Sequence, residues 1–494
     1  MHAVSVRGER FVDSFGREVI LHGMGLVCKD KSRNYIGDWN ESDFMKMQQW
    51  GCNVIRLGII WDGLEPEPGV YDDAYLDQME AWVRLAEQYG MHVFLDMHQD
   101  LYSYRYADGA PEWATITDDL PHVNDGIWSD AYLFSPAVQR AFDRFWENAP
   151  APDGIGLQDH YAAAWRHVAR KFGHNPCVIG YDLMNEPFIG SQVNDIQPLM
   201  FHQYGIETAQ ITGQSSWNEE ELPAVWMDPV KRMEALRLME DPELFRRVID
   251  VTEQGYKQFE QTKLMAFYRK TAAAIREADP TGLLFLETSY FCNLGVRSGI
   301  EPIVRDDGLR DPYQVYAPHG YDLVTDTDFV HTPSSSRVQV IFDRHEETRS
   351  RLRMPMLVGE WGAYGDSEHA GEAALAIKKI FERSLCSDTY WCYTHPDIDQ
   401  YSSFKGVQRG YPAAVAGELL RYAYDAGTGR FELEWVERAS DGESTVIYLP
   451  KLAGKRVLLS AGEHFDTVQI GGGESGYLHI HPHMPGERRK LVVE

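Results

Sequence analysis

Short apolar runs alternate with longer amphipathic segments over the first four hundred residues of the chain. A segment such as 75–86 carries apolar residues at positions i, i+3, i+4 and i+7, the period of a helix with one buried face. Eight apolar runs with strand character alternate with such segments, at 19–21, 54–57, 93–96, 178–181, 283–286, 315–317, 356–358 and 390–393. Eight strand–helix units predict an α/β fold, the (β/α)8 barrel. Residues 11–19, with Gly16 in a turn, predict a small hairpin before the first barrel strand.

Two connections in this region are longer than ordinary loops. Residues 190–260 separate the fourth strand from the helix that leads to the fifth, and Met, Trp and Gln are frequent among them. Residues 322–336 are a shorter, polar connection. Both are expected to leave the end of the barrel where catalytic groups sit. Each is therefore either a wall of a substrate cleft or an insertion without a part in binding.

The pattern changes after about residue 406. Period-two runs separated by Gly-rich turns replace the helices, at 431–435, 445–449, 457–459, 468–470, 478–481 and 491–493. Such spacing predicts an antiparallel β-sandwich. The expected domains are thus a catalytic barrel over residues 1–405, with its insertion at about 190–260, and a C-terminal sandwich over 406–494.

The sequence patterns that could suggest a phosphate-binding loop or a metal site have simpler structural explanations. The glycines at 471–473 form a turn, because no helix start follows them. Histidines 479, 481 and 483 are explained by alternation on one face of a strand. The six cysteines have neither metal nor redox spacing, so buried thiols are favoured over a disulfide. We expect no metal and no cofactor.

The charge composition limits the classes of molecule that the protein is expected to bind. With 47 Lys+Arg against 75 Asp+Glu in 494 residues, the formal net charge is −28. This argues against nucleic acid and anionic membranes, and fits a neutral ligand such as a sugar. No apolar run approaches the length of a membrane span, and no secretory signal is visible. The expected location is cytoplasmic, or secreted with the signal removed, and the oligomeric state stays open.

Two glutamates follow predicted strands. Glu186 lies in Met-Asn-Glu-Pro after the fourth run, and Glu360 lies in Val-Gly-Glu-Trp-Gly after the seventh. The strand ends of a parallel barrel meet at its catalytic rim. Cleavage of a glycosidic bond needs two carboxyl groups, one to protonate the leaving oxygen and one to attack or to activate water. The sequence therefore predicts Glu186 and Glu360 as the catalytic pair.

Other polar residues mark the same rim. Arg56 sits inside an apolar strand and must be paired, with Glu360 as the expected partner. Further polar and aromatic side chains end predicted strands, namely His98, His319, Tyr321 and Trp391. Each alone is more often structural. Together, facing two glutamates, they indicate a sugar-binding site.

This set of residues resembles glycoside hydrolase family 5, a retaining family built on a (β/α)8 barrel. The matching positions are Arg56, His98, Asn185, Glu186, His319, Tyr321, Glu360 and Trp391. Four stretches, 97–100, 108–114, 182–188 and 409–417, are similar to the endoglycoceramidase and glycosylceramidase branch of that family. The predicted sandwich also fits this branch, so the resemblance spans nearly the whole chain.

The resemblance implies roles for these residues. Glu360 is the nucleophile, kept ionised by Arg56 and Tyr321, and Glu186 is the acid and then the base. Asn185 bonds the sugar 2-OH, His98 and His319 bond other hydroxyls or position the glutamates, and Trp391 is an aromatic floor. Asp100, with Lys29 or Lys31, reads the remaining hydroxyls of the first sugar.

Three functions compete. The leading one is a retaining β-glycosidase for a glycolipid such as a glycosylceramide, with transient contact with lipid or detergent micelles. The second is an exo-acting β-glucosidase for aryl or steryl glucosides, or a β-1,4-glucanase. The third, a non-catalytic carbohydrate- or lipid-binding protein, is disfavoured because both glutamates and their supports are present. A ceramide site needs an apolar wall beside Glu186, expected from the loop 102–113 and from Phe188, Met200, Phe201, Trp217, Trp226 and Met227.

Overall fold

The computed structural model describes residues 2–124, 126–213, 222–438, 442–460 and 462–494. Its centre is a barrel of eight parallel strands. In chain order these are β4 (His22–Leu26), β5 (Val54–Ile60), β6 (His92–His98), β7 (Val178–Asp182), β8 (Leu283–Leu286), β9 (Gln314–Tyr316), β11 (Leu357–Val358) and β13 (Ser387–Tyr390). Strand β13 pairs with β4, and a parallel bridge from Tyr316 to Met356 closes the ring. The predicted (β/α)8 barrel is confirmed.

The first and last barrel strands lie away from their predicted positions. The run 19–21 lies entirely before β4, and only Tyr390 of the run 390–393 belongs to β13. Strand β4 contains two glycines, and β13 contains the buried Asp388. Because Asp388 forms an ion pair with Arg409 inside the protein and accepts a hydrogen bond from His22 at 3.1 Å, a charged residue occupies a strand that hydropathy alone does not mark.

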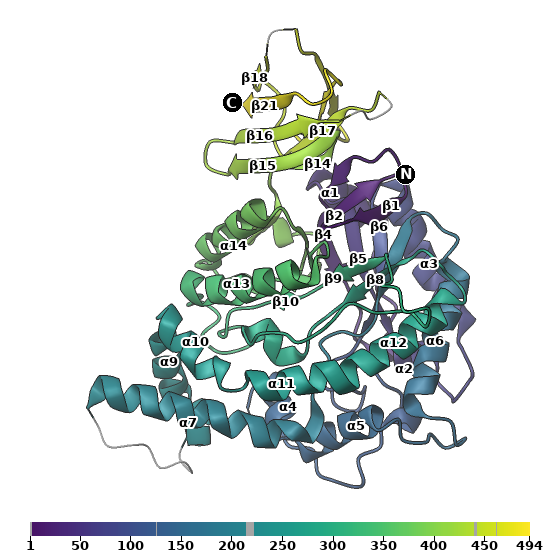
Figure 1. Cartoon of the computed structure of the whole chain (residues 1–494), viewed down its shortest axis with the longest axis vertical. Helices are drawn as coiled ribbons and strands as arrows, with labels where there is room; N and C mark the ends of the chain where they lie inside the picture. The colour runs from purple at the N-terminus through teal and green to yellow at the C-terminus, as the bar shows by residue number, and fades with distance from the viewer. Residues whose placement is uncertain (1, 125, 214–221, 439–441, 461) are drawn as a thin grey trace.

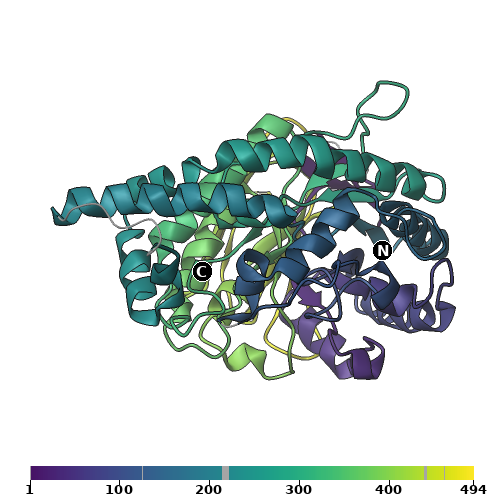
Figure 2. The same cartoon turned by 90° about the horizontal axis from the view of Figure 1, so that it is seen from below.

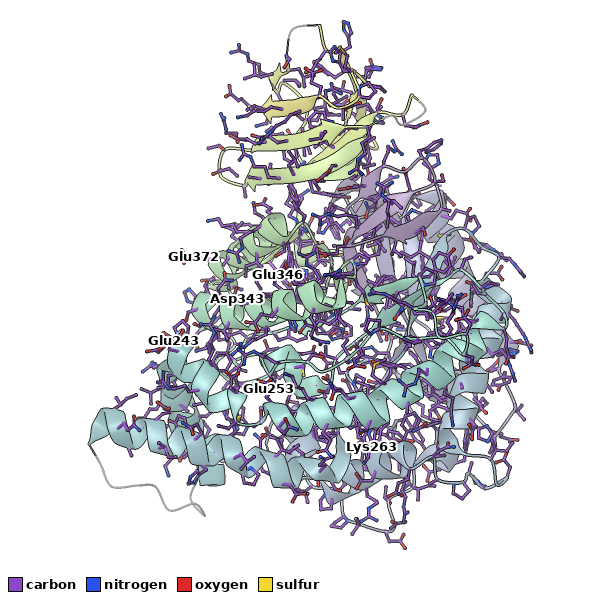
Figure 3. The ribbon with its side chains drawn as sticks, in the orientation of Figure 1. Glu243, Glu253, Lys263, Asp343, Glu346 and Glu372 are labelled. Atoms are coloured by element: carbon purple, nitrogen blue, oxygen red, sulfur yellow. The ribbon has the colours of Figure 1, made fainter. Side chains whose placement is uncertain are left out.

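Helices surround the barrel (Figure 1). The outer layer contains α1 (Glu41–Gln49), α3 (Asp73–Gln88), α6 (Leu157–Phe172), α12 (Met265–Arg276), α13 (Ser335–Leu352) and α14 (Ala370–Ser384). Three further helices, α2 (Trp61–Leu64), α4 (Ala131–Phe134) and α5 (Pro136–Trp146), lie near the rim. Helix α3 contains the predicted amphipathic segment and buries Leu76, Met79 and Val83. Figure 3 shows the charged side chain of Glu372, in α14, at the outline of the molecule, on the solvent side of this layer.

The predicted insertion is helical. It comprises α7 (Val193–Thr212), α8 (Leu222–Met227), α9 (Pro229–Leu238), α10 (Pro242–Asp250) and α11 (Glu253–Phe259), which continues through a π-helical turn, Glu260–Leu264, into α12. These helices lie at the end of the barrel away from the C-terminal strands, and α7 projects to one side (Figure 1). Seen from below, α7 runs across that end of the molecule (Figure 2). The insertion therefore covers part of the catalytic rim.

Two antiparallel sheets form a second unit, built from the C-terminal region and three N-terminal strands. One has the order β1-β2-β3-β14-β17-β20-β19 and the other β15-β16-β21-β18. The strands are β1 (Val4–Arg7), β2 (Arg10–Asp13), β3 (Glu18–Val19), β14 (Tyr411–Val415), β15 (Gly417–Asp425), β16 (Arg430–Glu437), β17 (Thr445–Leu449), β18 (Val457–Leu458), β19 (Phe465–Gln469), β20 (Gly476–Ile480) and β21 (Arg488–Val493). The predicted N-terminal hairpin is present as β2 and β3, and it belongs to the larger of these sheets. We propose a division near residue 405, in α15 (Phe404–Val407), with the N-terminal strands packed on the C-terminal unit.

Strands β14 and β15 are not apparent from the sequence pattern. Strand β14 contains a proline and two alanines, which are poor strand formers. In β15 the pairing with β16 shifts between Leu419 and Arg421, so strict alternation is broken by a bulge. All six cysteines are free thiols. No helix in the part of the chain that the structure describes is long and apolar enough to cross a membrane.

Candidate active site

Glu186 and Glu360 both lie at the carboxyl ends of barrel strands. Glu186 follows β7 by four residues and is buried. Glu360 begins β12 (Glu360–Trp361), directly after β11, and pairs in register with His319 of β10 (His319–Gly320). The predicted catalytic residues therefore meet at one rim, with His319 between them.

The distances around His319 define the spacing of the two carboxyl groups. Its Nδ1 lies 2.9 Å from Oε1 of Glu186 and 3.5 Å from Oε2 of Glu360. One oxygen of each glutamate and a ring nitrogen of His319 all lie within 4.8 Å of one another. Retaining glycosidases hold their carboxyl groups about 5–5.5 Å apart, whereas inverting enzymes need about 6.5–9.5 Å to admit a water molecule. The nearest oxygens of Glu186 and Glu360 are therefore closer than an inverting site requires, which favours a retaining site.

Arg56 is the electrostatic centre of the rim. Its guanidinium is fully buried in β5 and donates from Nη1 to Oε1 of Glu360 at 2.5 Å, the partner predicted from the sequence. It also donates to Asp182 at 3.0 Å, to Glu287 at 2.9 Å and to the side-chain oxygen of Asn185 at 2.9 Å. This many acceptors offset the cost of burying the charge.

Tyr321 completes the surroundings of Glu360. Its hydroxyl donates to Oε2 of Glu360 at 2.5 Å, so the two carboxylate oxygens have different donors. The amide of Asn185 donates to the main-chain oxygen of Gln99 at 3.0 Å, which leaves its second N–H for a ligand. Both residues lie where the sequence pattern predicts them.

A second group of predicted residues forms a polar floor. The rings of His98 and Trp391 are stacked with centroids 5.2 Å apart, and Nδ1 of His98 lies 2.8 Å from Asp96. The Lys29 ammonium lies 4.8 Å from the Trp391 ring centroid and forms an ion pair with Asp100. Burial raises the pKa of Asp100, but Lys29 and His98 outweigh it and hold that pKa at about 2. This floor therefore offers charged and aromatic groups to a sugar.

Lys31 is not part of this floor. Its ammonium pairs with Asp62 at 2.7 Å and lies 3.1 Å from the ring centroid of Tyr104. Of the two lysines considered, only Lys29 lines the cavity at the glutamates.

One cavity of about 210 Å³ joins the glutamates to an apolar channel. Its polar end is lined by Lys29, His98, Asp100, Asn185, Glu186, Tyr321, Glu360 and Trp391. Its apolar end is lined by Leu133, Met200, Phe201, Tyr204, Val225, Trp226, Met239, Phe245, Val248, Ile249, Phe291 and Leu294. Most of the apolar residues come from α7 to α10. The insertion therefore forms a wall of the cavity.

Several residues expected in this wall lie elsewhere. Phe188 is fully buried and packs against Tyr132 and Phe142. Met227 is 38% exposed and faces away from the cavity. Trp217 lies outside the described residues. The loop 102–113 does not reach the cavity, and residues 127–130 line it instead.

Family models match almost the entire chain. The model for cellulase (glycosyl hydrolase family 5) matches residues 12–397, and the model for the glycoside hydrolase family 5 C-terminal domain matches residues 409–493. The chain belongs to glycoside hydrolase family 5. As a member of this retaining family it is a glycoside hydrolase that works through a glycosyl-enzyme intermediate.

Individual relatives within the family are informative. An endoglycoceramidase of Cyanea nozakii is 33% identical over 501 residues, covering 91% of this chain and 84% of that protein. The structure of endo-glycoceramidase II from Rhodococcus sp. is similar with a TM-score of 0.73, 26% identity and 98% of both chains covered. Solved structures of that protein include a ganglioside GM3 complex and a lactosyl-enzyme intermediate. Ergosteryl-β-glucosidase of Saccharomyces cerevisiae is 26% identical over 210 residues, covering 32% of this chain and 28% of that protein.

Two further residues of this family 5 site, Glu287 and Asn293, are absent from the prediction made from the sequence. Glu287 directly follows β8 and accepts the main-chain N–H of Glu186 at 2.8 Å. Asn293, in a 3₁₀ helix (Tyr290–Leu294), donates to Oε1 of Glu186 at 3.3 Å and accepts the main-chain N–H of His319 at 3.1 Å. An acid at a strand end is the same signal that identified Glu360, so Glu287 was accessible to sequence reasoning; Asn293 carries no such signal.

The pH dependence of the family 5 reaction follows from the surroundings of Glu186. Burial, together with the negative charges of Glu360 and Glu287, raises the pKa of Glu186 to about 7, against the opposing influence of His319. An acid with a raised pKa is protonated below that value and loses its proton above it. We therefore expect kcat/KM on a substrate with a poor leaving group to fall as the pH rises through about 7. A kcat/KM that stays level to pH 9 would contradict this assignment.

Proposed function

We propose that the chain hydrolyses the β-glycosidic bond between a sugar and ceramide. The observation that carries the proposal is the single cavity in which the two glutamates border an apolar channel. A glycosylceramide has this shape, because its sugar continues directly into two hydrocarbon chains. A glucan would need hydrogen-bonding groups for sugar hydroxyls on both sides of the scissile bond, and the insertion helices offer mainly apolar side chains such as Met200, Phe201 and Ile249.

The proposed chemistry uses the two glutamates in sequence. Glu360 attacks the anomeric carbon and forms an ester with the sugar, while Glu186 gives its proton to the departing ceramide oxygen. Glu186, now a carboxylate, removes a proton from water, and the resulting hydroxide releases the sugar from Glu360. The free N–H of Asn185 bonds the sugar 2-OH, and Lys29, His98, Asp100 and Trp391 hold the sugar ring.

A steryl glucoside, in which the lipid aglycone is a sterol, is the second candidate substrate. The apolar channel and the likeness to ergosteryl-β-glucosidase both favour it. Glucosylceramide, galactosylceramide, lactosylceramide, a steryl glucoside and cellotetraose, assayed side by side with product identification, separate the alternatives. The proposal requires ceramide release; release of sterol alone would favour the second candidate.

Contact with neutral lipid or detergent surfaces is part of the proposal. Helix α7 lines the channel with Met200 and Phe201 and exposes Leu199 and Ile206 to 49% and 39%. Leu199 and Ile206 are seven residues apart and therefore lie on one face of the helix. The net charge of −28 favours a neutral surface over an anionic one.

Loss of a channel-wall side chain should lower kcat/KM more on a glycolipid than on an aryl glycoside. Trp226 lines the channel, and its indole donates to Asp130 at 2.9 Å. Trp226→Ala should lower kcat/KM on glucosylceramide by about 10-fold or more, because only the lipid draws binding energy from this wall. The loss on a nitrophenyl glycoside should stay within about 3-fold.

A matched substitution controls for general damage. Trp82 is a half-buried tryptophan of α3 that packs against Trp39, and it does not line the cavity. Trp82→Ala should change kcat/KM by the same factor on glucosylceramide and on the nitrophenyl glycoside. Equal losses for Trp226→Ala on both substrates would remove the reason for preferring a lipid aglycone.

A further inference from the structure

Glu287 touches three groups that hold the reacting carboxyls. It is fully buried at the end of β8. Its Oε2 accepts the main-chain N–H of Glu186 at 2.8 Å, and its Oε1 accepts from Nη2 of Arg56 at 2.9 Å. The same Oε1 lies 3.1 Å from Nε2 of His319. A single carboxylate thus reaches the backbone of the acid, the cationic partner of Glu360 and the imidazole partner of Glu186.

The backbone of Glu186 needs such support. Its φ angle is +43°, in the left-handed region that a residue with a Cβ rarely adopts. That conformation is unfavourable for a non-glycine residue, because its Cβ comes close to the following carbonyl oxygen. Glu287 accepts the main-chain N–H of Glu186. The side chain of Gln99 donates to the main-chain carbonyl oxygen of Glu186 at 3.2 Å. The peptide groups on both sides of the strained residue are therefore held.

Glu287 also lies against the ring of His319, with Oε1 at 3.1 Å from Nε2. With its Nε2 edge facing Glu287, the ring presents Nδ1 to Oε1 of Glu186 at 2.9 Å. Asn293 donates to this same Oε1. Across the residues that the structure describes, Oε2 of Glu186 accepts no hydrogen bond, and Glu186 lines the cavity. The oxygen without a protein partner is the one left to carry the proton for the leaving group.

We propose that Glu287 is a positioning residue for the acid step: by holding the backbone of Glu186 and the ring of His319, it directs the free oxygen of Glu186 towards the leaving group. This inference rests on the proposed role of Glu186 as the acid. Glu287 itself does not touch the substrate, because it is absent from the cavity lining.

The test is the dependence of kcat/KM on the leaving group, measured with aryl β-glucosides and β-lactosides. A phenyl glycoside needs a proton on its leaving oxygen, and a 2,4-dinitrophenyl glycoside does not. Glu287→Gln and Glu287→Asp should each lower kcat/KM on the phenyl glycoside by about 10- to 100-fold, part of the 10²–10⁴-fold that general acid catalysis contributes. Their loss on the dinitrophenyl glycoside should be at least ~5-fold smaller. Glu287→Asp keeps the charge and withdraws the carboxylate by one methylene, so it tests position where Glu287→Gln does not fold.

Glu260→Gln is the matched control. Glu260 is an equally buried carboxylate that accepts main-chain N–H groups from Ser289, at 2.8 Å, and Gly299, but it contacts neither Glu186 nor His319. Any loss that it causes should be equal for both leaving groups. Equal losses in the Glu287 variants, or none, would overturn the proposal. If Glu186→Ala also lost activity equally on both leaving groups, the assignment of Glu186 as the acid would fall instead.

Discussion

Glu360→Gln should abolish turnover and leave the fold intact. The amide has almost the shape of the carboxylate. Its oxygen can still accept from Arg56 and its NH2 group can donate to the Tyr321 hydroxyl, but it cannot attack the anomeric carbon to form an ester. We expect kcat to fall by about 10⁴-fold or more, since the covalent route supplies much of an acceleration that exceeds 10⁶-fold in most enzymes. The measurement is steady-state hydrolysis of an aryl glycoside and of glucosylceramide.

The unfolding temperature of the same variant separates chemistry from stability. A value close to that of the unchanged protein, with no turnover, assigns the loss to the missing nucleophile. Turnover above about 1% of the original rate by a folded Glu360→Gln protein would contradict the assignment of Glu360 as nucleophile.

Glu186→Ala should be nearly as damaging on glycosylceramide. Without the acid, the loss on this substrate should reach about 10²–10⁴-fold, the usual contribution of general acid catalysis. A dinitrophenyl glycoside should still form the glycosyl-enzyme at a near-normal rate, because its leaving group needs no proton. The ester on Glu360 then accumulates, since no base remains to activate water.

Azide distinguishes the two glutamates. A small anion can enter the space vacated by the Glu186 side chain and attack the ester, so added azide should restore turnover and give a β-glycosyl azide. Rescue of only the Glu360 variant, with an α-glycosyl azide as product, would mean that the two roles are reversed.

The barrel is predictable from the sequence because its strands are buried on both faces and therefore appear as continuous apolar runs. The prediction misplaces strands in which polarity is compensated in three dimensions. Asp388 of β13 forms an ion pair with Arg409, which lies beyond the last barrel strand, and a hydrogen bond with His22 of β4, which lies hundreds of positions earlier. No local window of the sequence contains that ion-pair cluster.

The same reasoning separates the predictable from the unpredictable parts of the site. Glu186, His319 and Glu360 could be brought together because parallel strand ends meet at one rim. Asn293 could not, because a short 3₁₀ helix after β8 carries it there. In the insertion, composition marked an apolar wall but not which face of each helix points inward, so Trp226 lines the channel while Met227, its neighbour, faces solvent.

The most direct test of the proposed function is proton NMR of the sugar first released from a glycosylceramide in detergent. We expect free ceramide and a sugar that appears as the β-anomer before it equilibrates, because two displacements at one carbon retain its configuration. Initial release of the α-anomer, or no cleavage of any glycosylceramide by a protein that hydrolyses aryl glycosides, would contradict it.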